Sequence, residues 1–247
     1  MSILQHFEKC NNFFCHESER NSAMKITHLG QAGLLFETEA CKVMIDPYLS
    51  NCVVKVNPAN WRRQPIDESI FDIRPDVLIF THNHLDHYDP ETAKKILDKH
   101  KGITVLAPTS VWNEVRQVAP GNNYVQFDRH TRWSEFGLRF EAVKATHSDP
   151  YAIGVILSDG EKKYYITGDT LYNEEIFGDL PQGLDVVFLP VNGVGNNMNM
   201  TDAADFFKKT GAKLAVPLHT GMFDTLDPND FPIQSKVIPE IYKEVKV

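Results

Sequence analysis

The sequence predicts a single α/β domain built as a four-layer αββα sandwich. The chain has 247 residues, of which 42% are hydrophobic and 23% charged, so one domain can bury a full core without disulfide support. Short apolar runs recur between turn residues, which is typical of strands. Strands come first and are then mixed with surface helices, and this order occurs twice. Such an order favours sheets in the middle with helices outside.

The first part of the chain begins with three short strands. We expect them at residues 25–29, 34–38 and 42–45, separated by glycines and by a short turn, as an antiparallel meander. Residues 46–70 follow as a long loop. Loops of more than about 12–15 residues in compact domains are usually functional or disordered, and the aromatic and arginine content of this one favours function. A continuous apolar run then predicts a buried strand at 77–80.

Helices and strands are mixed in the remainder. Helices are predicted at 90–99, at 108–118, at 201–210 with Thr201 as N-cap, and near Pro239 at the end of the chain. Strands are predicted at 104–107, 138–145, 154–158, 163–166, 185–189 and 214–217. Asp159 and Gly160 predict a hairpin turn between two of these strands.

Composition and the chain ends exclude several classes of protein. The net charge of -8 disfavours nucleic-acid binding. The sequence contains no run of eighteen apolar residues, so no membrane-spanning helix is predicted. Residues 1–23 lack the apolar core of a secretory signal and are predicted to be an N-terminal arm before a domain at 24–247. The four cysteines (Cys10, Cys15, Cys41 and Cys52) show no CxxC spacing, so we expect reduced thiols in a cytoplasmic protein. No oligomeric state is predicted.

A dense group of metal-ligand residues lies directly after the strand at 77–80. The segment 81–90 reads THNHLDHYDP and places His82, His84, Asp86 and His87 in an H-x-H-x-D-H pattern. Imidazole and carboxylate suit zinc and its first-row neighbours. The two histidines of H-x-H point the same way in extended backbone, so they can bind one ion, while Asp86 and His87 can face a second. The alternative is a polar loop that caps the following helix.

Three more potential ligands follow later strands. They are His147, Asp169 and His219, and each comes just past the carboxyl end of an apolar strand. Because strand ends along one rim of a sheet core converge, we expect these residues to join the His82 segment. Alone, each would more often be an ordinary loop residue. Together they complete a set of seven ligands.

This pattern resembles the metallo-β-lactamase fold superfamily of metal-dependent hydrolases. The resemblance covers residues 24 to about 225 and rests on H-x-H-x-D-H, a distant His, the Asp of T-G-D, and a final His. The finer sequence is similar to the ascorbate-6-phosphate lactonase-like branch. The segments that carry this likeness are THLGQAGLLFE at 27–37, IDPYLSN at 45–51, THNHLDHYDP at 81–90, TGDTLYN at 167–173 and PLHTGMF at 217–223.

The resemblance implies a dinuclear centre. One ion would be held by His82, His84 and His147, the other by Asp86, His87 and His219, with Asp169 bridging the two. Zinc is favoured and manganese is the alternative. A metal-bridging hydroxide would act as the nucleophile, and Asp86 would pass a proton to the leaving group. The absence of the H-x-E-x-D pattern of diiron flavoproteins favours hydrolysis over redox chemistry.

Further residues are candidates for recognising a small-molecule substrate. Arg62 and Arg63 would form a fork for phosphate or carboxylate, or else belong to a solvated loop face. Tyr48 and Tyr88 would form walls of the pocket, or else be packing residues. Asn192 would line the pocket, or else belong to a turn. Asp46 and Asp89 are expected to accept hydrogen bonds from ligating histidines. Asp46 could instead be a turn residue before Pro47, and Asp89 could cap the helix at 90–99.

The leading interpretation is therefore a hydrolase of a small polar ester or lactone, with an anionic substrate favoured by the charge of two divalent ions. A phosphodiesterase or phospholipase-like hydrolase using the same ions is the second interpretation. The third is a catalytically silent metal-binding sensor, against which the complete ligand set argues.

Overall fold

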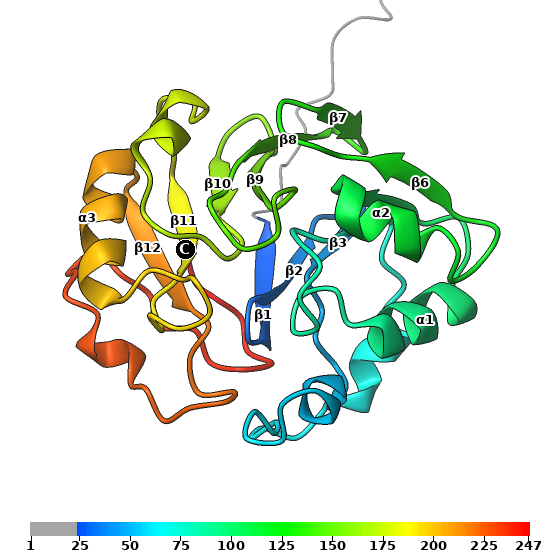
Figure 1. Cartoon of the computed structure of the whole chain (residues 1–247). Helices are drawn as coiled ribbons and strands as arrows, with labels where there is room; N and C mark the ends of the chain where they lie inside the picture. Colours follow the sequence, from blue (N-terminus) through cyan, green and yellow to red (C-terminus); the bar gives the residue numbers. More distant parts are fainter. Residues whose placement is uncertain (1–23) are drawn as a thin grey trace, which may run out of the picture.

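The computed structural model describes residues 24–247 as two six-stranded sheets packed face to face, with helices outside (Figure 1). The predicted arm at 1–23, with Cys10 and Cys15, lies outside the described residues. Within them, Cys41 and Cys52 are free and buried. None of the helices formed by residues 24–247 has the length and apolar character that a bilayer crossing requires.

The first sheet runs in the order β1-β2-β3-β4-β5-β6. Its first three strands pair antiparallel, which confirms the predicted meander, and β3 to β6 are parallel. The strands are β1 Lys25–Gly30, β2 Gly33–Glu37, β3 Lys42–Ile45, β4 Val77–Ile79, β5 Thr104–Ala107 and β6 Asn123–Gln126. Strands β1, β3 and β4 therefore all point the same way.

The second sheet runs in the order β12-β11-β10-β9-β8-β7. Strands β10, β11 and β12 are parallel, while β7 to β10 pair antiparallel. The strands are β7 Arg132–Glu135, β8 Leu138–Lys144, β9 Ile153–Ser158, β10 Lys163–Ile166, β11 Val186–Pro190 and β12 Leu214–Leu218. Strands β8, β10, β11 and β12 thus share one direction, and their carboxyl ends lie on one rim.

Alternation along each strand divides the apolar residues into three layers. In β2, Leu34 and Phe36 enter the core between the sheets, while Leu35 faces the opposite side. Phe36 meets Tyr164 and Phe188 of the second sheet edge-on, with ring centroids 5.8 Å apart in both pairs. This period of two is what half-buried strands require, and it fixes which face of each sheet the helices cover.

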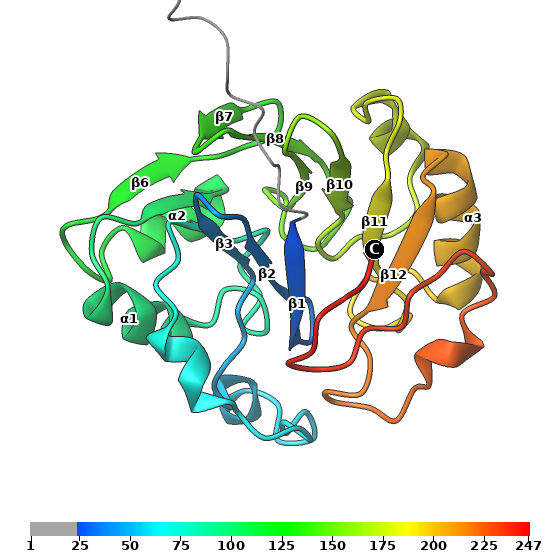
Figure 2. The same cartoon turned by 180° about the vertical axis from the view of Figure 1, so that it is seen from behind.

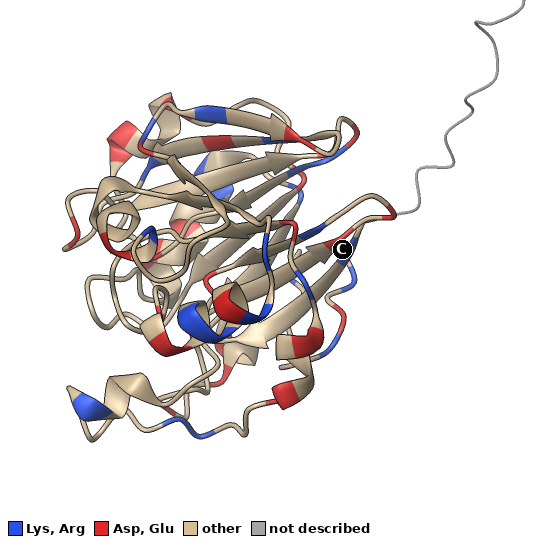
Figure 3. Ribbon diagram, turned by 90° about the vertical axis from the view of Figure 1, so that its right-hand side faces the viewer, with Lys and Arg blue, Asp and Glu red and all other residues tan. Residues whose placement is uncertain are grey.

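Helices α1 (Pro90–Lys99) and α2 (Thr109–Val115) cover the first sheet, and α3 (Met200–Thr210) covers the second. The view from behind in Figure 2 shows the same division, with α1 and α2 on one side and α3 on the other. Seen edge-on, charged residues of both signs are spread over helices, loops and strand edges (Figure 3). The predicted αββα sandwich is confirmed.

Three local predictions were wrong. Strands β6 and β7 were missed because they contain no buried residue, and so they show no apolar pattern. The N-cap of α3 is Asn199, whose side chain accepts from the backbone N–H groups of Thr201 and Asp202. No helix forms near Pro239; within the described chain the last residues form a turn and isolated bridges, because their backbone groups pair with strands.

The C-terminal segment 235–247 pairs with the edges of both sheets. It meets β12 through Val237 N and Ala215 O at 2.9 Å, and then β1 through Tyr242 N and His28 O at 2.7 Å and Val245 N and Ile26 O at 2.8 Å. Figure 2 shows this red trace running between β1 and β12. Edge strands left unpaired are prone to association, so the segment protects both edges.

We expect deletion of residues 242–247 to destabilise the domain. It removes three backbone hydrogen bonds to β1 and the buried side chain of Val245, which together should cost roughly 3 kcal/mol of unfolding free energy. Chemical denaturation measures the loss. Lys246→Ala, at an exposed position of the same segment, is the control and should change stability by less than about 0.5 kcal/mol. Equal midpoints for the deletion and the parent would contradict the role of this segment.

Candidate metal centre

The structure brings all seven predicted ligands together at the rim where co-directional strands end. The His82–His87 segment follows β4, His147 follows β8, Asp169 follows β10, and His219 follows β12. Gly168 has a left-handed backbone (φ +60°), and a Cβ there would lie 2.9 Å from Ile153 O and 3.0 Å from Thr81 Cβ. Only glycine fits, so the turn before Asp169 can pass close to the β4 end.

The first donor set consists of His82, His84, His147 and Asp169, with one ligand atom from each within 4.8 Å of the others. His84 Nδ1 lies 3.0 Å from His147 Nε2, and Asp169 Oδ2 lies 4.0 Å from the same nitrogen. His82 is fully buried, and its Nε2 has no hydrogen-bond partner among the described residues.

The second donor set consists of Asp86, His87 and His219. His219 Nε2 lies 3.2 Å from Asp86 Oδ2 and 3.4 Å from His87 Nε2. Asp169 reaches this set as well, with Oδ1 3.2 Å from His87 Nε2 and Oδ2 3.2 Å from His219 Nε2. Asp169 is therefore the residue that the two sets share.

These spacings suit metal ions. Two ligands held at ~2.0–2.1 Å by a tetrahedral ion lie about 3.4 Å apart, close to the separations of the second set. Asp169 Oδ1 is buried and lies near His87 Nε2, but the two atoms are not aligned for a hydrogen bond. Atoms that are close, unpaired and directed at a common point are the arrangement that a cation would complete. The residues present fit the dinuclear centre.

The carboxylates make the centre strongly attractive to positive charge. Burial alone would lower the pKa of His87, but the carboxylates of Asp169 and Asp46 raise it well above its ordinary value. Burial would also lower the pKa of His219, but the carboxylates of Asp169 and Asp86 raise this pKa to about 9. In contrast, burial lowers the pKa of His82 well below its usual range, so this ring stays neutral and able to bind a metal.

Asp46 accepts hydrogen bonds on the outer side of the ligands. Its Oδ2 lies 2.7 Å from His87 Nδ1, and its Oδ1 accepts from Thr81 N at 2.8 Å. The Thr81 hydroxyl donates to Asp46 and lies 3.0 Å from His82 Nδ1. One buried carboxylate therefore orients His87 directly and His82 through Thr81, and it leaves the Nε2 atom of each ring free for the centre.

Asp89 has the alternative role considered for it. Its Oδ1 accepts from the backbone N–H groups of Glu91 and Thr92, and its Oδ2 accepts from the Thr92 hydroxyl. All of these contacts belong to the first turn of α1, so Asp89 is an N-cap. It makes no hydrogen bond to a histidine within the described chain.

Three predicted substrate residues are packed inside the protein. Arg62 is buried and donates to Tyr48 O at 2.6 Å, Gln64 O at 2.9 Å and the Tyr242 hydroxyl at 2.8 Å, so it ties the long loop to the C-terminal segment. Tyr48 is fully buried and packs on Phe223, and Tyr88 is buried against Phe80. The prediction of an Arg62–Arg63 fork walled by these tyrosines was wrong, because the side chains of Arg62, Tyr48 and Tyr88 make internal contacts instead.

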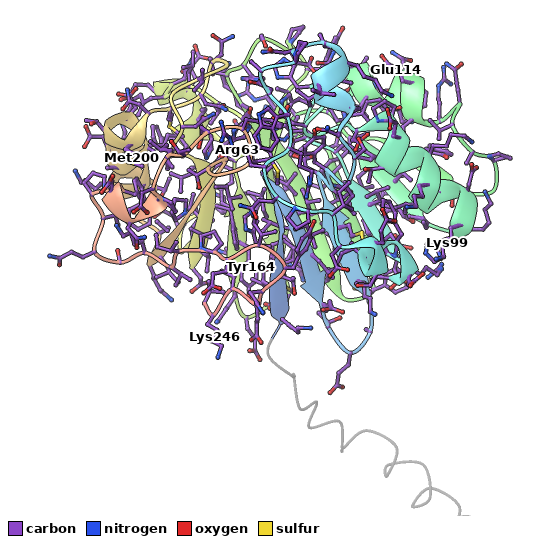
Figure 4. All side chains as sticks on the ribbon, turned by 90° about the horizontal axis from the view of Figure 1, so that it is seen from below. Arg63, Lys99, Glu114, Tyr164, Met200 and Lys246 are labelled. Carbon is purple, nitrogen blue, oxygen red and sulfur yellow. The ribbon has the colours of Figure 1, made fainter. Side chains whose placement is uncertain are left out.

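Arg63 remains available to a substrate, whereas the side chain of Asn192 contacts a histidine. Arg63 is exposed, and its guanidinium lies over the Trp61 ring at 5.1 Å. Its backbone N–H donates to Met222 O, three residues after His219, which holds the arginine beside the chain segment of a ligand. Figure 4 shows that Arg63 lies well apart from Lys246, which is near the end of the chain. Asn192 Nδ2 lies 3.0 Å from His219 Nδ1.

Two site residues escaped the list of predicted site residues. Gln31 is buried, and its Nε2 donates to Asp86 Oδ2 at 2.7 Å; Asn197 is buried and donates to Asp169 Oδ2 at 2.8 Å. Gln31 does not stand out from the sequence, because carboxamides are ordinary turn residues, whereas Asn197 lies in a glycine-rich loop that could line a pocket or be a plain turn cluster. The available signal was position, because Gln31 directly follows β1 and Asn197 lies in the loop after β11.

Three site residues share an unusual backbone. Gln31, Asp46 and His219 have φ values of +53°, +44° and +65°, and each directly follows its strand. The left-handed conformation costs a non-glycine residue on the order of 1–3 kcal/mol and is concentrated at functional sites. Here it turns three side chains from the strand ends into one centre.

Comparison with known proteins agrees with this geometry. Residues 42–220 match the family described as the Beta-lactamase superfamily domain. A UPF0173 metal-dependent hydrolase of Ligilactobacillus salivarius is 30% identical over 233 residues, covering 89% of this chain and 95% of the relative. The UPF0173 protein PF0020 of Pyrococcus furiosus is 27% identical over 227 residues, covering 90% of this chain and 97% of that protein.

A solved structure shares the fold at lower identity. Igni18, described as a novel metallo hydrolase from Ignicoccus hospitalis, superposes with a TM-score of 0.73 at 21% identity, covering 90% of this chain and 97% of that chain. The family match spans most of the present domain, and the relatives align over nearly their full lengths. The chain therefore belongs to the beta-lactamase superfamily, in the family of the UPF0173 metal-dependent hydrolases.

Proposed function

We propose that the protein hydrolyses a small polar ester or lactone at a centre of two divalent ions, with zinc favoured over manganese. One observation carries the proposal: two sets of buried and half-buried donors share Asp169, and the buried atoms His82 Nε2 and Asp169 Oδ1 have no hydrogen-bond partner among the described residues. Bound there, two ions would lower the pKa of water to roughly 7 and polarise a carbonyl oxygen. No serine or cysteine nucleophile is then needed.

The ligands divide the work between the two ions. His82, His84 and His147 would hold the first, and Asp86, His87 and His219 the second. Asp169 contacts donors of both sets, so it would set the distance between the ions. Histidine and aspartate ligands without a glutamate in the H-x-H-x-D-H segment favour hydrolysis over oxidation.

Asp86 is the proposed proton donor to the leaving group. Gln31 Nε2 and His219 Nε2 both approach its Oδ2, at 2.7 and 3.2 Å. Its Oδ1 makes no hydrogen bond within the described chain, and the side chain is 16% exposed. Burial alone would raise the pKa of Asp86, but His219 and His87 outweigh burial and lower it. The free Oδ1 would therefore take up the proton of the attacking hydroxide and then pass it to the leaving group.

The substrate preference depends on Arg63 more than on the ions. The charges of two divalent ions, one hydroxide and the carboxylates of Asp86 and Asp169 would sum to about +1. The carboxylate of Asp46 beside His87 offsets this charge. The centre itself is then close to neutral. Any preference for an anionic group on the ester or lactone would therefore come from the exposed guanidinium of Arg63.

We expect two divalent ions per chain in protein reconstituted with zinc or manganese. Elemental analysis and titration measure the stoichiometry, and a panel of lactones, aryl phosphodiesters and thioesters measures turnover. A protein that binds no metal ion at saturating metal concentration would contradict the proposal. Two bound ions with no turnover on any ester would instead support a metal-binding sensor, and turnover of phosphodiesters alone would assign the phosphodiesterase interpretation.

Asp169→Ala should lower kcat/KM at least about 100-fold, because the residue shared by both donor sets is lost. The substitution should also weaken the binding of one ion more than that of the other. Calorimetric titration and steady-state kinetics check the two effects. Asp205→Ala, at an exposed position of α3, is the control and should behave as the parent. Full activity of Asp169→Ala with two ions bound would disprove the assignment.

Arg63→Ala should raise KM for an anionic substrate much more than for a matched neutral ester, with metal content unchanged. A charge-assisted hydrogen bond contributes about 1.5–3 kcal/mol, so the selectivity ratio should fall roughly tenfold or more. Arg116→Ala is the matched control, because this exposed guanidinium also lies over a tryptophan ring, and it should keep the ratio of the parent. An unchanged ratio in Arg63→Ala would show that Arg63 does not recognise the anion.

A further inference from the structure

One loop contacts three of the seven ligands. It joins β11 to α3, and we call residues 192–197 the asparagine loop. Asn192 Nδ2 lies 3.0 Å from His219 Nδ1, Asn196 O lies 3.2 Å from His147 Nδ1, and Asn197 Nδ2 donates to Asp169 Oδ2 at 2.8 Å. These three ligands come from three separate strands, and none belongs to the His82–His87 segment.

The loop is held firmly at its base. Gly193 N donates to Met198 O and Met198 N donates to Thr170 O, both at 3.0 Å. Asn192 and Asn199 form an isolated antiparallel bridge, and Met198 is fully buried. The loop is therefore tied to the residue next to Asp169 and closed on itself, so its three contacts have fixed positions.

Both histidine contacts lie on the ring nitrogen that faces away from the centre. His219 directs Nε2 toward Asp86 and Asp169, and His147 directs Nε2 toward His84, so Nδ1 is the outer atom in each ring. Ligating histidines usually donate this outer N–H to an oxygen, which fixes the ring and its tautomer. Asn196 O already has the position to accept from His147.

We propose that the asparagine loop is a positioning element that orients His147, Asp169 and His219 for metal binding. This inference rests on the proposed function, because it assigns the loop a role toward the same ions. Asp46 and Thr81 support His82 and His87 from the first sheet, and the asparagine loop provides the equivalent support from the second sheet.

The Asn192 carboxamide can offer its oxygen to His219 in the loaded centre. A metal on His219 Nε2 leaves the proton on Nδ1, and this N–H needs an acceptor. Asn192 Oδ1 is buried without a partner in the described chain, and half a turn of the carboxamide exchanges it with Nδ2. The oxygen then accepts from His219 Nδ1–H at the place where Nδ2 now lies.

Four variants test the loop in the full chain. Asn192→Ala and Asn197→Ala each remove one contact and should weaken zinc binding about 10–100-fold. Asn192→Asp keeps an acceptor oxygen for His219 and should retain the affinity of the parent. Val194→Ala is the matched control, because Val194 belongs to the same loop but its side chain is exposed and contacts none of the three ligands.

Zinc affinity is measured by calorimetric titration, and the visible spectrum of the cobalt-substituted protein reports ligand geometry without depending on turnover. We expect altered cobalt spectra in Asn192→Ala and Asn197→Ala and parent-like spectra in Asn192→Asp and Val194→Ala. If Asn197→Ala does not fold, Asn197→Asp, which keeps the volume but removes the donor, should show the same weakening.

The outcomes separate the two proposals. A parent protein that binds no zinc overturns the proposed function and the role of the loop with it. A parent that binds two ions, with unchanged affinity in Asn192→Ala and Asn197→Ala, overturns only the role of the loop. Equal losses in Asn192→Ala and Asn192→Asp would overturn the assignment of Asn192 as an acceptor for His219.

Discussion

Three carboxylates buried among histidines are the constraint on which the rest of this structure depends. Asp46 and Asp169 are almost fully buried, and Asp86 lies beside them. A buried carboxylate is strongly unfavourable unless positive charge or hydrogen bonds compensate it. Here His87 and His219 lie within 3.2 Å of carboxylate oxygens. The same negative charge that raises the pKa of these histidines would attract divalent ions, so the fold must hold these groups together for the site to exist.

The two sheets meet this constraint from opposite sides. Strand β4 delivers the His82–His87 segment, and the second sheet delivers His147, Asp169 and His219. Each sheet also supplies its own outer hydrogen bonds, through Asp46 and Thr81 in the first and through the asparagine loop in the second. Ligands from both halves would share the ions, so metal binding would join the two sheets at this rim, while the C-terminal segment joins their edges elsewhere.

Periodicity and strand-end position predicted most of the fold and the convergence of the seven ligands. The apolar alternation that places Leu34 and Phe36 between the sheets is visible in the sequence, and so is the Asp–Pro start of α1. Features that depend on pairing partners were not predictable. Strand β6 has no buried residue, and the last residues of the chain form isolated bridges instead of a helix because β1 and β12 offer free backbone groups. The roles of Gln31 and Asn197 likewise follow only from their hydrogen bonds to carboxylates, which the sequence does not show.

Arg62 and Arg63 show why adjacent identical residues need the structure to be told apart. In extended backbone, neighbouring side chains point to opposite sides, so one arginine of a pair on a covering loop faces inward. Arg62 is 8% exposed and has its donors used by carbonyl and hydroxyl oxygens, whereas Arg63 stacks on an exposed tryptophan. The long loop is therefore anchored by one arginine and presents the other. A loop fixed in this way can hold a charged group near the segment that follows His219 without losing much side-chain entropy on binding, which is the condition for the proposed role of Arg63.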